Sequence, residues 1–308
     1  MPHWLLKSAL HRVVSLLPNP HWWNEQIQTR FLKSLDFGPE QLRARLAHCR
    51  KFLDHFLRHR PDCADGFSAV ELGTGWYPFL PIGLWLCGAS EVWTYDIASL
   101  LKPARVQNLM KLLGDFAESG ELARLLPRSR PERMAQLRSA IADAERVDPA
   151  ELLARFNIRI HVRDAKQTGL PPQSADFFCS YSVLEYIPRP VLVSLHREFA
   201  RVARPGAVAV HFIHLDDEYA KFDQKLSPFH FLKFTEAQWR WLRSALNPLT
   251  RLRISDYREA ITEAGFAIVE EENSMGDIEG LPLAPEFQRY SREDLAVLES
   301  WLVAQVSA

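Results

Sequence analysis

Residues 67–78 read FSAVELGTGWYP, and the interpretation of the whole chain starts from this stretch. Its first six residues are mostly apolar and run into Gly73, which predicts a buried strand that enters a tight turn. A helical stretch follows from Leu80 to Cys87, and a second run, EVWTYD, ends at Asp96. Strand, helix and strand at this spacing predict a βαβ unit and therefore a parallel sheet.

The later apolar segments continue this alternation of strands and helices. The charged, helix-rich segment over 99–156 interrupts it after the second strand. The sequence therefore predicts an α/β fold with one doubly wound, mostly parallel sheet, a helical N-terminal extension and a helical insertion. The further strands are expected over 158–163, 175–180, 207–213 and 266–270, and the helices over 190–203 and 255–264.

The composition is typical of a soluble globular protein. Of the 308 residues, 47% are hydrophobic and 24% are charged, and the net charge is -1, which excludes a disordered chain and a generally basic nucleic-acid coat protein. The four cysteines lie far apart without a CxxC pair, as expected of reduced thiols in the cytoplasm. No apolar run reaches the length of a membrane span, and the N-terminus lacks the features of a signal peptide, so neither is expected.

The N-terminal region is basic and helical. Residues 1–60 hold ten basic and four acidic residues, and apolar residues recur at helical spacing over 5–17 and 39–59. These helices are expected to pack on the rest of the fold, with a weak peripheral membrane contact as the alternative. His55 and His59 lie four residues apart, a spacing that suits a metal ion. Because no third ligand is evident, a solvated helix face and no metal site are expected.

The turn after the first strand indicates the kind of ligand. Gly73 and Gly75 let the backbone turn sharply and approach a ligand closely, but Pro78 stands where a dinucleotide-binding GxGxxG motif has its third glycine. Glu71 argues against a phosphate at this turn and suits a cationic group such as the ammonium of an amino acid. Asp96 ends the second strand, where a carboxylate accepts hydrogen bonds from both hydroxyls of a ribose. The pattern favours a nucleoside with a cationic tail over NAD.

Five segments in this order resemble the motifs of the class I S-adenosylmethionine-dependent methyltransferases. The resemblance covers roughly residues 67–270 and implies a Rossmann-like methyltransferase fold with S-adenosyl-L-methionine as the cofactor. Tyr77 stands where many members have a third glycine, and Tyr186 replaces the His that commonly follows Val-Leu-Glu. The segments are VELGTG (70–75), WTYDI (93–97), RDA (163–165), ADFFCSYSVLEYI (175–187) and FARVARPG (199–206).

The resemblance also implies roles for individual residues. Asp96 would hold the ribose, Ile97 would pack on the adenine, and Asp164 would bind the adenine amino group. Ser180 and Tyr181 would face the methionine or the substrate. The full set of implied cofactor-binding residues is Glu71, Gly73, Thr74, Gly75, Asp96, Ile97, Asp164, Ala165, Ser180 and Tyr181.

Candidates on the acceptor side come from the ends of the fourth and fifth strands and from an aromatic segment. His214 follows the fifth strand and is the best-placed general base, while His211 points to the opposite face of that strand, so the two are not expected to chelate one metal. Glu185 suits a cationic or hydroxylated substrate, and His230 is a third catalytic candidate. Each also has an ordinary structural interpretation. Trp22, Trp23, Tyr77, Tyr186 and Tyr219 are the candidates for substrate contact.

These observations predict two units and one leading function. Residues 1–64 are expected to form a helical extension that caps the substrate, and residues 65–308 a methyltransferase domain with an insertion at about 99–156 and a substrate lid at about 214–250. The predicted function is methylation of an oxygen or nitrogen of a small-molecule metabolite in the cytoplasm, by a monomer or homodimer without a nucleic-acid partner. A lipid- or glycan-linked acceptor and a catalytically silent partner protein are the alternatives.

Overall fold

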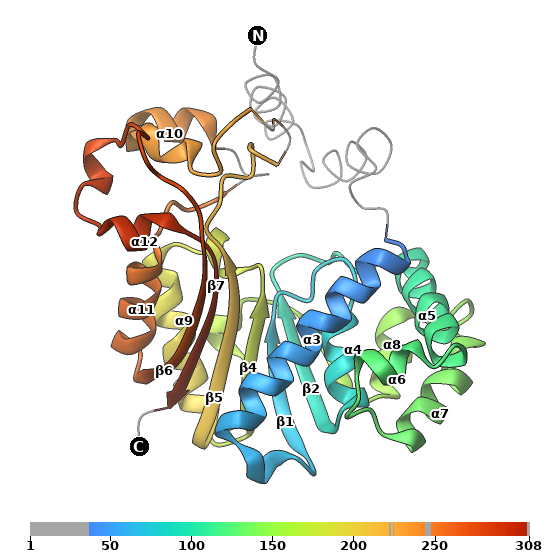
Figure 1. Ribbon diagram of the computed structural model, residues 1–308. Coiled ribbons are helices and arrows are strands. Elements are labelled where there is room, and N and C mark those ends of the chain that lie inside the picture. The colour runs from blue at the N-terminus through green and yellow to red at the C-terminus, as the bar shows by residue number, and fades with distance from the viewer. Residues whose placement is uncertain (1–36, 222, 224, 244–247, 307–308) are drawn as a thin grey trace.

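A computed structural model of the chain describes residues 37–221, 223, 225–243 and 248–306. In this part of the chain, seven strands form one sheet in the order β3-β2-β1-β4-β5-β7-β6 (Figure 1). The strands β1 to β5 are parallel, and β7 runs antiparallel to β5 and β6. The strands are β1 (Phe67–Leu72), β2 (Ala89–Asp96), β3 (Ile158–Val162), β4 (Ala175–Tyr181), β5 (Ala203–His214), β6 (Phe266–Met275) and β7 (Val297–Val306).

The centre of the sheet is covered by helices on both faces. All six residues of β1 are buried, with Phe67 and Ala69 in the apolar core of one face and Val70 and Leu72 in the core of the other. The strand order reverses between β1 and β4, and open parallel sheets bind ligands outside the carboxyl ends of their strands at such a switch point. The predicted α/β class is confirmed, and the GTG turn lies at the switch point.

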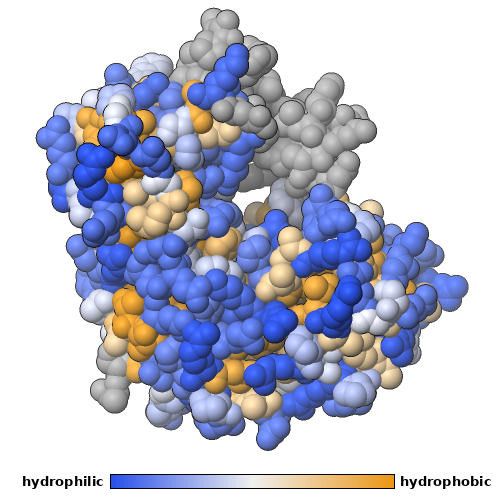
Figure 2. Space-filling model, viewed as in Figure 1, coloured by the Kyte–Doolittle hydropathy of each residue, from blue (hydrophilic) through white to orange (hydrophobic). Residues whose placement is uncertain are grey.

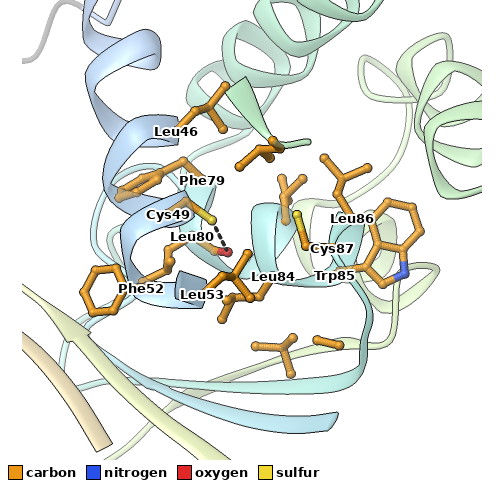
Figure 3. Packing of buried hydrophobic residues seen from close by; sticks show 14 of the residues in the cluster. Leu46, Cys49, Phe52, Leu53, Phe79, Leu80, Leu84, Trp85, Leu86 and Cys87 are labelled. Atoms are coloured by element: carbon orange, nitrogen blue, oxygen red, sulfur yellow. Dashed lines mark hydrogen bonds between the residues drawn. The ribbon is translucent and has the colours of Figure 1, made fainter. Parts of the chain in front are cut away.

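Helix α3 (Pro39–His59) covers one face together with α4 (Phe79–Leu86). It starts cleanly because Pro39 occupies its first turn and the Gln41 side chain accepts a hydrogen bond from the Gly38 amide. The two helices approach closely, with Cys49 of α3 next to Leu80 of α4 (Figure 3). A Cβ on Gly83 would lie 2.4 Å from the Cys49 Sγ. The described part of the predicted extension therefore shares a core with the sheet.

The helical insertion after β2 is present and packs on the same side as α4. Its members are α5 (Pro103–Glu118), α6 (Glu121–Leu125), α7 (Pro131–Ile141) and α8 (Pro149–Ala154). The opposite face of the sheet is covered by α9 (Arg189–Val202) and α11 (Ile254–Glu263). All four cysteines are buried free thiols. Among the described residues, none of the helices has both the length and the apolar character needed to cross a membrane.

A lobe with its own apolar cluster stands above the carboxyl end of β5 (Figures 1 and 2). We call it the cap: the described residues of 215–250, which include α10 (Glu236–Leu242), together with 276–296, which include α12 (Arg292–Ala296). Arg253 is fully buried and donates hydrogen bonds to the carbonyl groups of Leu215, Leu295 and Val297, so one side chain ties both segments of the cap to the sheet. The predicted lid segment lies in this lobe.

Two sequence-based expectations change in the structure. The segment 297–306 was not expected to form a strand, yet it forms β7, which places β6 at the edge of the sheet. The prediction of a solvated face at His55 is wrong, because this side chain is only 1% exposed. Both differences have one cause: the sheet extends beyond β5 and passes beneath the last turns of α3, which contact β6 through His55, His59 and Glu270.

Candidate active site

The turn after β1 has a backbone that requires glycine. Gly73 and Gly75 have φ values of 81° and 64°, in the left-handed region that favours glycine. A Cβ on Gly73 would lie 2.3 Å from a methyl carbon of Val183, whereas a Cβ on Gly75 would meet only the Gly73 carbonyl oxygen, at 4.0 Å. The turn is thus packed against the segment after β4 at Gly73, with open space beside Gly75. The neighbouring Thr74 hydroxyl hydrogen-bonds Thr94 at 2.5 Å and holds the turn to β2.

Glu71 is a buried carboxyl group that lacks a full set of partners. It is 3% exposed, and its Oε2 has no hydrogen-bond partner. Burial, and secondarily the charge of Asp96, raises the pKa of Glu71 well above its usual value. A cationic ligand group beside this carboxyl would favour its ionised form. The residue therefore fits the ammonium-bearing end of S-adenosylmethionine.

Asp96 organises the tips of β1 and β2. Its Oδ2 accepts a hydrogen bond from the Gly75 amide and its Oδ1 accepts one from the Ala98 amide, each at 3.0 Å. A carboxylate has about four lone-pair sites, so both oxygens keep acceptor capacity for the hydroxyls of a ribose. Ile97 is 86% exposed beside it, and its contact with the adenine stays a prediction. We call Glu71, Gly73, Gly75, Asp96 and Ile97 the cofactor end.

The segment after β3 lies next to the cofactor end. The Arg163 amide donates to the Asp96 carbonyl oxygen at 2.8 Å. The exposed Asp164 side chain accepts from the Lys166 amide at 2.9 Å and caps the short helix that follows, while Ala165 is buried beneath it. Asp164 has a local structural role in this structure, and its contact with an adenine amino group stays a prediction.

Ser180 belongs to a buried chain of hydrogen bonds. Its Oγ lies 2.8 Å from His211 Nδ1, His211 Nε2 lies 3.1 Å from His196 Nε2, and His196 Nδ1 lies 2.8 Å from the Leu192 carbonyl oxygen. Because a carbonyl only accepts, His196 carries its proton on Nδ1, His211 donates from Nε2, and Ser180 donates to His211. Burial lowers the pKa of His196 to about 4 and that of His211 well below its usual value, so both rings are neutral. The Ser180 hydroxyl proton is therefore held inside the core.

Tyr181 faces two residues of α3 that the sequence analysis did not select. The Arg45 guanidinium lies 4.4 Å from the centre of the Tyr181 ring, and the His48 ring centre lies 5.2 Å from it. Among the described residues, no carboxylate lies within ion-pair distance of Arg45. The sequence could have indicated Arg45, because this arginine lies within the apolar stripe of an amphipathic helix, next to Leu42 and Leu46, which are fully buried.

His214 ends β5 opposite Glu299 of β7. The His214 Nδ1 lies 3.3 Å from Glu299 Oε1 and 3.8 Å from Asp216 Oδ1. The neighbouring His214 is the main cause that lowers the pKa of Glu299. A carboxylate close to Nδ1 favours a proton on that nitrogen and leaves Nε2 for another partner, as in an oriented general base. Glu299 was not selected from the sequence because β7 was not recognised as a strand.

Two of the predicted catalytic residues line the same small, tightly packed pocket, and we call it the acceptor pocket. Glu185 is 2% exposed, its Oε2 has no hydrogen-bond partner, and burial raises the pKa of its carboxyl group. The structure thus brings Glu185 and His214 together, as a shared site requires. The polar residues that line the pocket are Glu185, His214, Asp216, Thr250, Arg253 and Tyr257.

The remaining candidates lie elsewhere. His230 has its Nδ1 3.4 Å from Asp217 Oδ2, and Tyr219 donates to the Leu242 carbonyl oxygen, so both side chains are held within the cap. The Tyr186 hydroxyl donates to Glu218, and Tyr77 stacks on Phe37 with ring centres 4.2 Å apart. None of the four lines the acceptor pocket. Trp22 and Trp23 lie outside the described residues.

One family model and several solved structures are similar to this chain. Residues 131–211, which include β3, β4 and α9, match the family described as "Methyltransferase domain". Among curated protein sequences, none matches this chain. Solved structures that are similar include a SAM-dependent methyltransferase from Methanosarcina mazei (14% identity, 79% of this chain and 93% of that chain, TM-score 0.40).

Two other similar structures are named with a substrate. One is magnesium protoporphyrin IX methyltransferase from Synechocystis PCC 6803 with bound SAH (15% identity, 88% of this chain and 89% of that chain, TM-score 0.45). The other is geranyl diphosphate C-methyltransferase from Streptomyces coelicolor A3(2) (12% identity, 85% of this chain and 77% of that chain, TM-score 0.47). The family match falls within the predicted motif region of a doubly wound sheet, and it supports an S-adenosylmethionine-dependent methyltransferase with S-adenosyl-L-methionine as its cofactor.

Proposed function

We propose that this enzyme methylates a nitrogen or an oxygen of a small-molecule metabolite whose reacting group binds at the acceptor pocket, beside Glu185 and His214. The observation that carries the proposal is the shared position of Glu185 and His214 in one pocket at the carboxyl ends of β4 and β5. That edge of the sheet also holds the cofactor end, on the neighbouring strands β1 and β2. Donor and acceptor would thus meet above the same edge.

In methyl transfer, the main task of the protein is to position the cofactor and the acceptor relative to each other. S-adenosylmethionine supplies a methyl group on a positively charged sulfur. In the proposed site Glu71 faces the ammonium of the bound cofactor and Asp96 its ribose, while the open backbone at Gly75 allows close approach. Such positioning lowers the barrier of a bimolecular displacement by several kcal/mol, on the order of 7–11 kcal/mol in the best intramolecular cases.

His214 is proposed as the general base. Its Nδ1 lies 3.3 Å from Glu299 Oε1, and its Nε2 would take a proton from the acceptor as the new bond to the methyl group forms. Glu185 is proposed to hold the reacting group, as an acceptor of its hydrogen bonds or as a counter-ion. The proton therefore ends on His214, and the bond electrons of the departing methyl group stay on sulfur.

The charges around the acceptor pocket favour a nitrogen acceptor. Glu185 and Asp216 line it, and Glu299 lies behind His214. Arg253 donates to backbone carbonyl groups, and Asp216 pairs with Lys221 at 3.3 Å. Among the described residues, Glu185 is therefore the carboxyl group of the pocket that has no ion pair. A protonated amine would be drawn to this pocket and would transfer its proton to His214 before or during methylation.

The experiment is a mass-spectrometric screen of methyl transfer with matched sets of amines, alcohols and carboxylic acids. Amines are expected to be methylated, and Glu185→Gln is expected to lose most of this activity while Glu118→Gln, at an exposed position, retains it. Methylation of lipid- or glycan-linked acceptors alone would favour the first alternative. Cofactor binding without methylation of any class would favour a silent partner protein.

A further inference from the structure

The end of α3 and the edge strand β6 bring together four side chains that are typical metal ligands. His55 and His59 lie four residues apart on one face of the helix, and Glu270 and Glu272 lie two residues apart on the strand. This cluster lies outside the acceptor pocket and the cofactor end. Glu270 and Glu272 are the additional possible ligands that were not evident from the sequence around His55 and His59.

The distances between the ligand atoms of His55, Glu270 and Glu272 match a small coordination sphere, and His59 adjoins this group through Glu270. The Glu270 Oε2 lies 3.3 Å from His55 Nδ1 and 3.2 Å from His59 Nε2. Ligand atoms of His55, Glu270 and Glu272 all lie within 4.8 Å of one another. In a tetrahedral zinc site with bonds of about 2.0–2.2 Å, neighbouring ligand atoms lie about 3.3 Å apart. The Glu270 carboxylate thus lies close to both histidine rings.

The His55 side chain is a second, independent indication. It is 1% exposed, and neither of its ring nitrogens has a hydrogen-bond partner. Its Nδ1 faces Glu270 and its Nε2 faces Glu272, at 3.3 and 3.8 Å. A neutral imidazole has one N–H, so one ring nitrogen turns a lone pair toward a carboxylate oxygen. A cation between them would satisfy both groups.

The two carboxylates are oriented by residues on their outer side. Arg58 donates to Oε1 of Glu270 and Lys51 donates to Oε2 of Glu272, so these oxygens point outward. The opposite oxygens, Glu270 Oε2 and Glu272 Oε1, face His55. Metal-bound carboxylates are commonly hydrogen-bonded in this way by residues that do not touch the ion.

We propose that His55, His59, Glu270 and Glu272 form a binding site for a divalent transition metal ion, with Zn²⁺ the best match. Two imidazoles and two carboxylates without a thiolate suit zinc, while magnesium and calcium prefer oxygen ligands alone. The ion would join α3 to the edge of the sheet. Because α3 also carries Arg45 and His48 against Tyr181, the site would fix one wall of the active site from a distance.

The test is calorimetric titration of the full chain, purified without a histidine tag and stripped of metal, with ZnCl₂ and separately with MgCl₂. One zinc ion per chain is expected, with no comparable binding of magnesium. Glu270→Gln should abolish this binding, and His59→Gln and Glu272→Gln should each weaken it at least about 10-fold. Saturation with zinc should raise the melting temperature of the wild type by about 5 °C and leave that of Glu270→Gln unchanged.

The control is Glu91→Gln. It removes a carboxylate that pairs with Arg159 near the opposite edge of the sheet from β6. This variant should bind zinc like the wild type. Binding of S-adenosylhomocysteine by each variant reports whether the protein is folded, independently of zinc. Absence of stoichiometric zinc binding, or equal zinc affinity in Glu270→Gln, would overturn the proposal; the second result would place the ion elsewhere, for example on the N-terminal His3, His11 or His21.

Discussion

The cofactor end and the acceptor pocket differ in how far apart their residues lie in the sequence. The cofactor end lies within residues 71–97, on two adjacent parallel strands and the turns after them. The acceptor pocket and its surroundings draw on α3, the segment after β4, the end of β5 and β7, through Arg45, Glu185, His214 and Glu299. A site made by one βαβ unit is a local property of the chain, whereas a site made by distant segments depends on the whole fold.

The largest expected effect is on the acceptor side. His214→Ala should lower the turnover number about 100- to 10,000-fold, because it removes the proposed general base. The dissociation constant for S-adenosylhomocysteine should not change, since His214 is not part of the cofactor end. Steady-state kinetics on an amine found in the screen, together with calorimetry, would measure both; a fall in cofactor affinity equal to the fall in turnover would remove the distinction between the two regions.

The next effect is on the backbone of the cofactor end. Gly73→Ala should reduce the free energy of unfolding by about 3 kcal/mol, because it combines a left-handed φ of 81° with a Cβ only 2.3 Å from Val183. Gly120→Ala is the matched control: its φ is 74°, yet a Cβ there meets nothing within 4 Å, so about 1 kcal/mol is expected. Chemical denaturation measures both values. Equal losses would show that contact with Val183 does not shape the turn.

A smaller effect is expected at Asp96. The change Asp96→Ala should weaken cofactor binding about 10- to 150-fold, which corresponds to the loss of a charge-assisted hydrogen bond of about 1.5–3 kcal/mol. The same change removes the two bonds to the Gly75 and Ala98 amides. Asp96→Asn keeps acceptor capacity on one oxygen and should recover part of the affinity. An unchanged dissociation constant in both variants would show that Asp96 does not contact the ribose.

The smallest expected effect is a pH dependence of cofactor affinity, which arises from Glu71 in the cofactor end. Burial raises the pKa of Glu71, so this carboxyl is protonated in the free protein over a range that extends above its usual pKa of 4.5. A bound ammonium favours the ionised form, so cofactor affinity should rise with pH, by at most about tenfold per unit, until the raised pKa is passed. In the ligand-free protein, the raised pKa of Glu71 makes the free energy of unfolding change in the opposite direction. The stability that Glu71 contributes is lost as the pH rises through its raised pKa.

Glu71→Gln provides the control for this pH dependence. The variant cannot ionise at residue 71, so its cofactor affinity should vary less between pH 5.5 and 8 than that of the wild type. Calorimetry at several pH values would measure the slope for each protein. Parallel slopes would assign the pH dependence to other groups and remove Glu71 from the ammonium of the cofactor.

The difference between the cofactor end and the acceptor side explains which site residues could be predicted from the sequence. Glu71, Gly73 and Asp96 follow from strand ends and turns that a local pattern indicates, and His214 follows from the end of a recognisable strand. Arg45 and Glu299 were missed because their position depends on where α3 and β7 pack. The same is true of His55: its burial against β6 cannot be inferred from the helix alone, because the helix pattern says nothing about which strand lies beneath it.

The central claim, that the GTG turn and Asp96 bind S-adenosylmethionine and not a dinucleotide, has one direct test. Calorimetric titration of the full chain with S-adenosylhomocysteine and, separately, with NAD would measure both affinities under one set of conditions. We expect one binding site for S-adenosylhomocysteine, weakened in Asp96→Ala, and no heat of binding with NAD. Binding of NAD with no response to S-adenosylhomocysteine or S-adenosylmethionine would contradict the account.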